Sequence, residues 1–185
     1  MLDGWDQLSD VSNGKIVFSR LDATFRQSIM VFDTSTSNIT EIDPVTPSVR
    51  SNGAIGSNTV AFIDRHLAPT GELMAADIGG ATVRVTNDSR SDDHPSVAPL
   101  GDLIVYESCL TPGNCDIRQA GRIGASWVVT NRTDNAHHDA NPDTDGGVVV
   151  YDAIRAGQRD IYWQSVGGVT EEVLSLAPSM YCVKV

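Results

Sequence analysis

A unit of about 44 residues recurs four times along the chain, and this repeat restricts the fold more than any other feature. In each unit an apolar run ends in an aromatic residue, at Phe18, Phe62, Tyr106 and Tyr151. The steps between these aromatic residues are 44, 44 and 45. An aliphatic marker recurs every 44 residues, at Ile29, Leu73, Ile117 and Ile161. A period of this length indicates stacked supersecondary units that bury their apolar faces against one another.

Within each unit, the residue pattern is typical of short β-strands. In the fourth unit, residues 147–152 and 160–164 are rich in β-branched and aromatic side chains, and turn residues separate them. No segment has a sustained 3.6-residue apolar period, so we expect essentially no helix. A third marker pairs residues 86–89 with 130–133, again 44 apart. Four strands per unit at this period predict the blade of a β-propeller.

We therefore predict one all-β propeller domain built from four-stranded blades. The blades span approximately residues 5–47, 48–91, 92–135 and 136–176. Their innermost strands are expected near residues 6–10, 48–54, 93–98 and 137–142. Residues 177–185 align with the opening strand of a fifth blade. Two arrangements remain open, a four-bladed ring with an extra strand or half of a larger ring completed by a second chain, because sheet edges must be covered.

The composition excludes some classes of partner. The formal net charge is −11, and there is no cluster of Lys and Arg of the kind that binds nucleic acid. The chain holds 19 Asp and only 5 Glu, which favours a turn-rich β protein because Asp closes turns. No apolar run is long enough to span a bilayer, and the first residues do not form a signal peptide.

Three cysteines give a weaker signal. Cys109 and Cys115 bracket a loop with strong turn residues, and antiparallel strands on either side would bring the two thiols together. A disulfide would favour an oxidising compartment, whereas two free thiols near a hairpin remain the alternative. Cys182 has no evident partner.

Three segments resemble the repeats of the TolB-type β-propeller family: HPSVAPLGDLIVYES, ANPDTDGGVVVYDAIRAGQRDIYWQS and ADIGGATVRVTND. Such repeats combine a proline before an Asp/Gly turn, an Ile-Val-Tyr strand, an Asp-Ile-Tyr strand and a Gly-Gly turn. The resemblance covers nearly the whole chain and is closest in the third and fourth blades. It implies a scaffold that binds proteins or ligands, most often in the bacterial envelope or secreted. Some related propellers carry enzymatic domains, so the fold alone decides little about function.

One candidate site is a group of histidines and aspartates. His94 and His138 are 44 residues apart and are expected to be equivalent, with Asp6 and Arg50 at the corresponding positions of the other blades. The other members of the group are His137, Asp92, Asp93 and Asp139. Turns that enter innermost strands surround one mouth of a propeller channel, so this face is predicted to bind a ligand. The alternative is that each residue stabilises its own turn.

A second candidate is a calcium loop. Asn141, Asp143, Asp145 and Gly146 match the first half of such a loop, and Asp152 stands at its twelfth position. The same residues are also typical of the turn between two strands of the repeat, and we favour this interpretation. The histidine and aspartate group is a further candidate for a divalent ion, because imidazole and carboxylate groups are common metal ligands. No other metal or cofactor is expected.

The sequence shows no arrangement that activates a nucleophile and no phosphate-binding motif. We expect a non-enzymatic propeller scaffold that binds a protein or carbohydrate partner through one face, and the chain can also form a homo-oligomer that completes the ring. The alternative is a propeller-type hydrolase or lyase that uses His94, His138 and Asp139. A periplasmic or secreted location is favoured by the resemblance.

Overall fold

The computed structural model describes residues 4–45, 47–168 and 172–173, and these residues form β-strands and turns without any helix. None of the described residues belongs to a helix that is long and apolar enough to cross a membrane. The strands form four antiparallel sheets of four strands each, in the order of the chain. The predicted all-β propeller fold is therefore confirmed.

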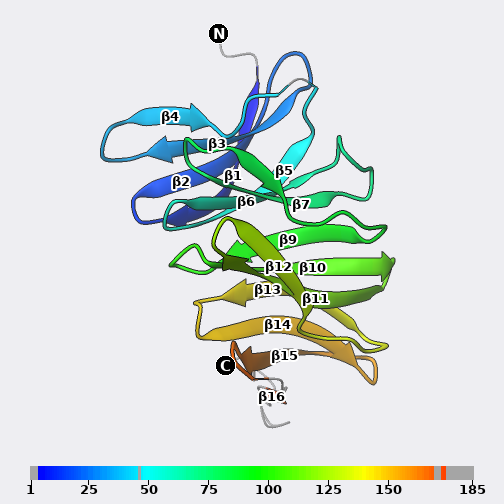
Figure 1. Ribbon diagram of the computed structural model, residues 1–185. Helices are drawn as coiled ribbons and strands as arrows, with labels where there is room; N and C mark the ends of the chain where they lie inside the picture. The colour runs from blue at the N-terminus through cyan, green and yellow to red at the C-terminus, as the bar shows by residue number, and fades with distance from the viewer. Residues whose placement is uncertain (1–3, 46, 169–171, 174–185) are drawn as a thin grey trace, which may run out of the picture.

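The four sheets, or blades, follow the sequence repeat (Figure 1). The first comprises β1 (Trp5–Ser12), β2 (Lys15–Leu21), β3 (Gln27–Asp33) and β4 (Asn38–Glu41). The second comprises β5 (Arg50–Gly56), β6 (Thr59–Asp64), β7 (Glu72–Asp77) and β8 (Thr82–Arg84). The third comprises β9 (Ser91–Val97), β10 (Leu103–Thr111), β11 (Asn114–Ile123) and β12 (Ser126–Asn131). The fourth comprises β13 (His138–Thr144), β14 (Val148–Arg155), β15 (Gln158–Ser165) and β16 (Glu172–Val173).

The sheets form an open arc. Successive innermost strands contact one another, β1 with β5, β5 with β9 and β9 with β13. Figure 1 places the first sheet at one end of the molecule and the fourth at the other. Of the two predicted arrangements, the structure shows four blades of a partial ring. The predicted additional strand at residues 177–185 lies outside the described residues.

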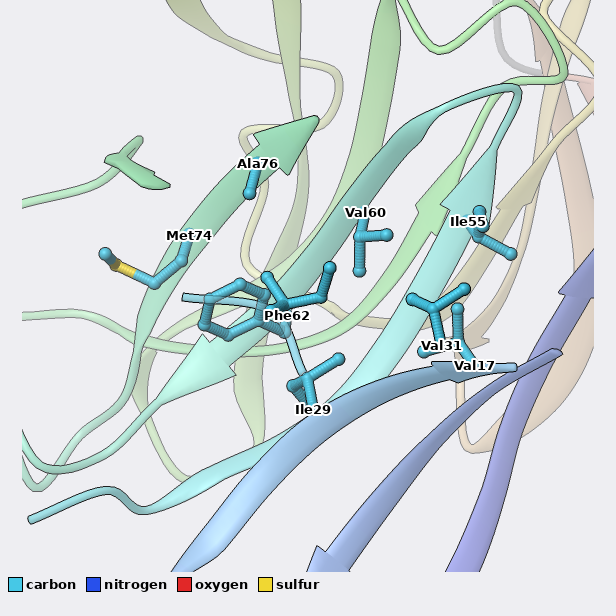
Figure 2. Close-up of a cluster of buried hydrophobic side chains, with 9 residues drawn as sticks. Val17, Ile29, Val31, Ile55, Val60, Phe62, Met74 and Ala76 are labelled. Atoms are coloured by element: carbon cyan, nitrogen blue, oxygen red, sulfur yellow. The ribbon is translucent and has the colours of Figure 1, made fainter. Parts of the chain in front are cut away.

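Each sheet has two apolar faces with different roles. We call the side that packs on the next sheet along the chain the forward face, and the side that packs on the previous sheet the rear face. Figure 2 shows the first of these interfaces. It joins the forward face of the first sheet to the rear face of the second. Its buried members are Val17, Ile29, Val31, Ile42, Ile55, Val60, Phe62, Met74 and Ala76.

The same packing recurs between the second and third sheets and between the third and fourth. The aromatic marker of the repeat lies on the rear face, where Phe62, Tyr106 and Tyr151 are at most 1% exposed. The aliphatic marker lies on the forward face, where Ile29, Leu73 and Ile117 are 0% exposed. The 44-residue periodicity of the sequence thus reflects an interface between sheets that recurs in every blade. Burial of apolar side chains in this interface supplies the stabilising free energy.

The spacing of the innermost strands differs from the predicted 44 residues. The Leu73 N–H donates to the Thr86 hydroxyl, and the Ile117 N–H donates in the same way to Thr133, at 2.8 Å in each case. Thr86 therefore corresponds to Thr133 and not to Thr130, so the predicted third marker is wrong. The β11–β12 hairpin contains longer strands than the β7–β8 hairpin. Because of these extra residues, the next innermost strand begins later in the sequence.

The segment 141–146 was expected to be a turn, but β13 continues to Thr144 and the turn begins at Asp145. A register shift between Ala140 and Asp143 accommodates Pro142 within the strand. Proline has no N–H for the ladder, and a bulge removes the need for one.

The close approach of neighbouring blades provides a stability test at Gly56, the last residue of β5. A Cβ atom on Gly56 would lie 1.9 Å from the backbone oxygen of Ala98 in the third blade. Gly121 in β11 has no atom within 4 Å of the same position and serves as a matched control. We expect Gly56→Ala to lower the free energy of unfolding by about 1–3 kcal/mol or more, since the backbones must separate. Gly121→Ala should change it by less than about 1 kcal/mol. Urea denaturation measures both values, and equal effects would contradict the close packing of these blades.

Candidate functional site

The innermost strands of all four blades line one pocket on the inner side of the arc. Its volume is about 360 Å³. Each blade contributes three or four consecutive residues: Gln7, Leu8, Ser9 and Asp10; Asn52, Gly53 and Ala54; His94, Pro95 and Ser96; Asn141, Pro142 and Asp143. The pocket lies along the innermost strands, and of the candidate residues predicted from the sequence it includes His94, Asn141 and Asp143.

The backbone is irregular where each strand reaches the pocket. The pairing register shifts between Leu8 and Asp10, between Ser51 and Ala54, between Ala140 and Asp143, and in β9 between Asp93 and Ser96. In each of the last three blades, the first bulged residue has a φ near +50°. The values are 52° for Asn52, 47° for His94 and 51° for Asn141. This left-handed conformation is uncommon for residues other than glycine, and bulges near functional sites redirect side chains. The bulges therefore place these three side chains around the pocket.

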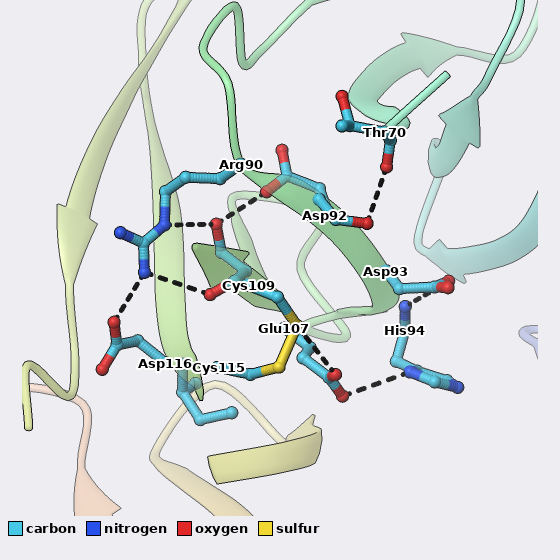
Figure 3. Close-up of a disulfide and its surroundings, with 12 residues drawn as sticks. Thr70, Arg90, Asp92, Asp93, His94, Glu107, Cys109, Cys115 and Asp116 are labelled. Atoms are coloured by element: carbon cyan, nitrogen blue, oxygen red, sulfur yellow. Dashed lines mark hydrogen bonds and ion pairs between the residues drawn. A yellow bond between two sulfur atoms is a disulfide. The ribbon is translucent and has the colours of Figure 1, made fainter. Parts of the chain in front are cut away.

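His94 is the ionisable side chain of the pocket with the clearest partner. Its side chain is 53% exposed, and its Nδ1 lies 3.3 Å from an oxygen of Glu107 on β10. The hydrogen bond to Glu107 raises the pKa of His94, with a further contribution from the charge of Asp93. His94 can thus donate a hydrogen bond to a ligand while Glu107 holds the imidazole in place (Figure 3).

Asp93 and Glu107 join the pocket to neighbouring blades. Asp93 accepts hydrogen bonds from the Asn52 amide of the second blade and, at 2.8 Å, from Arg65. The Glu107 oxygen that contacts His94 also accepts the backbone N–H of Asn141 in the fourth blade at 3.3 Å. Because both carboxylates bridge blades, a ligand that contacts them also contacts the groups that hold the arc together.

Asp10 and Asp143 complete the acidic lining. Asp10 accepts the backbone N–H of Ile55 at 2.8 Å, and Asp143 accepts the Ser96 hydroxyl at 2.7 Å. With Asp93 and Glu107 nearby, the pocket carries more negative than positive charge. Such a lining favours a cationic group or a hydroxyl-rich ligand over an anion.

The predicted histidine group does not come together as expected. Strand pairing sets Asp92 opposite Ser108 and Asp139 opposite Ala153, so these two aspartates are equivalent. His94 consequently corresponds to Asn141, and its predicted equivalence with His138 is wrong. The longer β11–β12 hairpin causes this three-residue difference. Asp6 in the first blade and Arg50 in the second occupy the register position of Asp92 and Asp139.

Of the predicted group, His94 lines the pocket, and Asp93 lies beside it, where it accepts the His94 N–H and the Asn52 amide. His137, His138, Asp92 and Asp139 have separate environments. His137 precedes β13 and is exposed, while His138 begins that strand opposite Ile154. Asp139 is 0% exposed and binds Arg155 at 2.5 Å and the Asn135 amide at 2.9 Å. These contacts stabilise the entry to the innermost strand, which is the structural role that the sequence left open.

Asp92 occupies the equivalent buried position in the third blade. The hydroxyls of Thr86 and Ser108 donate to its two oxygens at 2.6 Å and 2.7 Å. Burial nevertheless raises the pKa of the Asp92 carboxyl to about 6, since the two hydrogen bonds offset only part of the desolvation. The Ser108 hydroxyl also accepts a hydrogen bond from Arg90 at 3.1 Å. Arg90 in turn binds Asp116 (Figure 3).

The residues of the predicted calcium loop contact protein groups. Asp145 accepts the N–H groups of Gly147 and Val148 in the turn that follows β13. Asp152 accepts from Asn141 and from Arg159. Calcium binding by this segment stays a prediction. Among the described residues, the one set of three potential metal ligands within 4.8 Å of each other is Glu107, Cys109 and Cys115.

Those two cysteines form a disulfide, so their sulfur atoms do not act as thiolates. Cys109 and Cys115 are direct partners across β10 and β11, with a Cα–Cα distance of 3.9 Å. The bond closes the β10–β11 hairpin two residues beyond Glu107. Cys182 lies outside the described residues.

The sequence prediction did not include Asn52, Ser96, Glu107 or Asp10 in the site. Asn52 had a usable signal, because Asn-Gly readily adopts the left-handed backbone required at a bulge. No sequence signal pointed to Glu107, because it lies on β10 and is brought beside the pocket only by the pairing of β10 with β9, in which it is opposite Asp93.

No protein-family model matches the chain, and no characterised relative matches it by sequence. Solved structures are similar in fold. A protein described as a TolB from Agrobacterium tumefaciens has a TM-score of 0.66 at 19% identity, over 88% of this chain and 61% of its own. A chain from a nidogen/laminin complex has a TM-score of 0.57 at 15% identity, over 92% of this chain and 61% of its own.

A prolyl endopeptidase has a TM-score of 0.69 at 14% identity, over 92% of this chain but only 26% of its own. The chain thus spans less than two thirds of each of these structures. At such identities the similarity establishes a TolB-like β-propeller fold, as the sequence resemblance predicted, and leaves activity and partners open.

The pKa of Asp92 gives a test of the buried network. The folded-state pKa of about 6 exceeds the unfolded value of about 3.9, so the folded protein holds the proton more tightly between these pH values. The stability that this proton contributes is complete below pH ~4 and is lost as the pH rises through about 6. Asp92→Asn should remove this dependence.

Relative to wild type, the variant should gain up to about 3 kcal/mol in free energy of unfolding between pH 4 and pH 7. Urea denaturation across this range measures the difference, with the exposed Asp102→Asn as control. Parallel profiles for wild type and Asp92→Asn would show that the carboxyl titrates normally.

Proposed function

We propose that the protein is a non-enzymatic propeller scaffold that binds a protein or carbohydrate partner at the pocket on the inner side of the arc. The observation that carries this proposal is the convergence of four bulged innermost strands on one concave site. Concave sites with a few convergent polar groups are the usual location of ligand binding.

The chemistry of the pocket supports a basic or hydroxyl-rich partner. Asp10 and Asp143 can accept hydrogen bonds from ammonium, guanidinium or hydroxyl groups, and the exposed His94 can donate or accept one. A lysine or arginine side chain of a partner protein fits this lining, as do the hydroxyls of a saccharide. The Cys109–Cys115 disulfide is consistent with an oxidising compartment, which supports a periplasmic or secreted location.

The enzymatic alternative has less support. It requires His94, His138 and Asp139 to act together, yet Asp139 is completely buried in its contacts with Arg155 and Asn135. Only His94 of the three lines the pocket. The prolyl endopeptidase similarity concerns about a quarter of that protein and supplies no residue of this chain with a catalytic role.

The pocket can be tested with two probe panels, neutral oligosaccharides and short peptides that contain Lys or Arg. We expect binding from at least one panel, and His94→Ala should weaken it about tenfold, as loss of a charged hydrogen bond does. Calorimetric titration measures the affinity, and peptide binding should weaken as salt is added.

His66→Ala is the matched control, because His66 is an exposed loop histidine outside the pocket. It should leave the affinity unchanged. Binding that is equally strong in His94→Ala would place the site elsewhere, and the absence of binding across both panels would remove support for the proposal.

A further inference from the structure

The two end sheets of the arc each present an uncovered apolar face. The first sheet has no preceding sheet among the described residues, so its rear face is open. Within the described part of the chain, no following sheet covers the forward face of the fourth sheet. The residues on both faces can be compared with equivalent residues that are buried in the three internal interfaces.

The rear face of the first sheet carries side chains of the kind that are buried elsewhere. Val11, paired with Ile16, is 65% exposed. Its equivalents Ile55 and Val97, each at the matching register position, are only 3% and 6% exposed. Two further apolar residues lie on this face opposite Phe18 and Phe32, and both are exposed: Leu8 at 71% and Ile39 at 51%.

The forward face of the fourth sheet shows the same contrast. Ile161 is 46% exposed, while its equivalents Ile29, Leu73 and Ile117 are all 0% exposed. Val150 and Trp163 are paired on this face and are half-buried. The corresponding pair in the first sheet, Val17 and Val31, is at most 3% exposed because the second sheet covers it.

An ion pair repeats the pattern on the rear faces. Arg50 and Asp64 form it in the second sheet at 2.9 Å, with side chains only 5% and 4% exposed. The first sheet has the same pair with the partners exchanged, Arg20 and Asp6 at 2.8 Å, and these side chains are 29% and 46% exposed. Each arginine also lies over the aromatic marker of its sheet, Phe62 or Phe18. The first sheet therefore has the features of a covered sheet, with Leu8, Val11 and Ile39 exposed although Phe18 and Met30 at the centre of the face are only 9% and 8% exposed.

We propose that a second copy of this chain supplies both covers, with the rear face of the first sheet of one copy packed on the forward face of the fourth sheet of the other. This contact would repeat the interface that the chain already uses three times. The end faces are complementary halves of that interface. Two copies paired in this way form two equivalent contacts, and these contacts cover all four end faces.

Charge does not oppose this pairing. Arg20 is neutralised by Asp6 on one end face, and Arg159 is neutralised by Asp152 at 2.6 Å on the other. The closed dimer would contain eight blades, which is within the range of about four to eight observed for propellers. The pairing does not depend on what the pocket binds.

The proposal predicts a dimer of twice 19.8 kDa, measured by light scattering over a series of concentrations. Val11→Arg and Ile161→Arg each place a charge on one end face, and each should weaken self-association by more than about tenfold. Both positions are exposed in the single chain, so circular dichroism should show an unchanged fold. Leu100→Arg, at an 81% exposed turn residue away from both faces, is the matched control and should remain dimeric.

Mixing the two variants distinguishes head-to-tail pairing from pairing of like faces. The Val11→Arg chain retains an intact forward face, and the Ile161→Arg chain retains an intact rear face. Their equimolar mixture should therefore recover a dimer that neither variant forms alone. A wild-type chain that stays monomeric at all concentrations would overturn the proposal. So would a dimer that persists in either variant, or a mixture that remains monomeric.

Discussion

The packing of one sheet face against the next is the interaction on which the structure depends. A four-stranded antiparallel sheet with two apolar faces cannot be stable alone in water, since both faces would be solvated. Each sheet covers half of its neighbour's apolar surface, and the three resulting clusters account for most of the buried hydrophobic residues. Side chains at the interfaces are therefore constrained in size and shape, whereas the outer strands β4, β8 and β12 remain largely exposed.

This constraint also explains where polar chemistry is placed. The middle strands of the internal sheets are buried on both faces, as the unbroken burial of β6 shows, so they have no room for a ligand. The innermost strands face the inner side of the arc, and their bulges release residues from the ladder at that point. The pocket is thus formed where regular pairing is interrupted. Hydrogen bonds such as Asn52 to Asp93 and Ser96 to Asp143 then connect the bulges across blades.

The repeat made the fold predictable because Phe62, Leu73 and their equivalents mark opposite sides of one recurring interface. The site was less predictable because its position depends on register. A count of 44 residues from His94 reaches His138, but strand pairing makes Asn141 the equivalent residue. Hairpin lengths vary without disturbing the buried markers, since extra residues at a hairpin end project into solvent. Sequence spacing therefore locates the core accurately and the innermost strands only within about three residues.

Glu107 links the candidate site to the stability of the arc. Its carboxylate holds the His94 imidazole and also accepts the Asn141 backbone N–H from the next blade. Two residues away, Cys109 closes the β10–β11 hairpin and limits how far the end of β10 can move. One carboxylate oxygen therefore contacts both the candidate site and the backbone of the fourth blade.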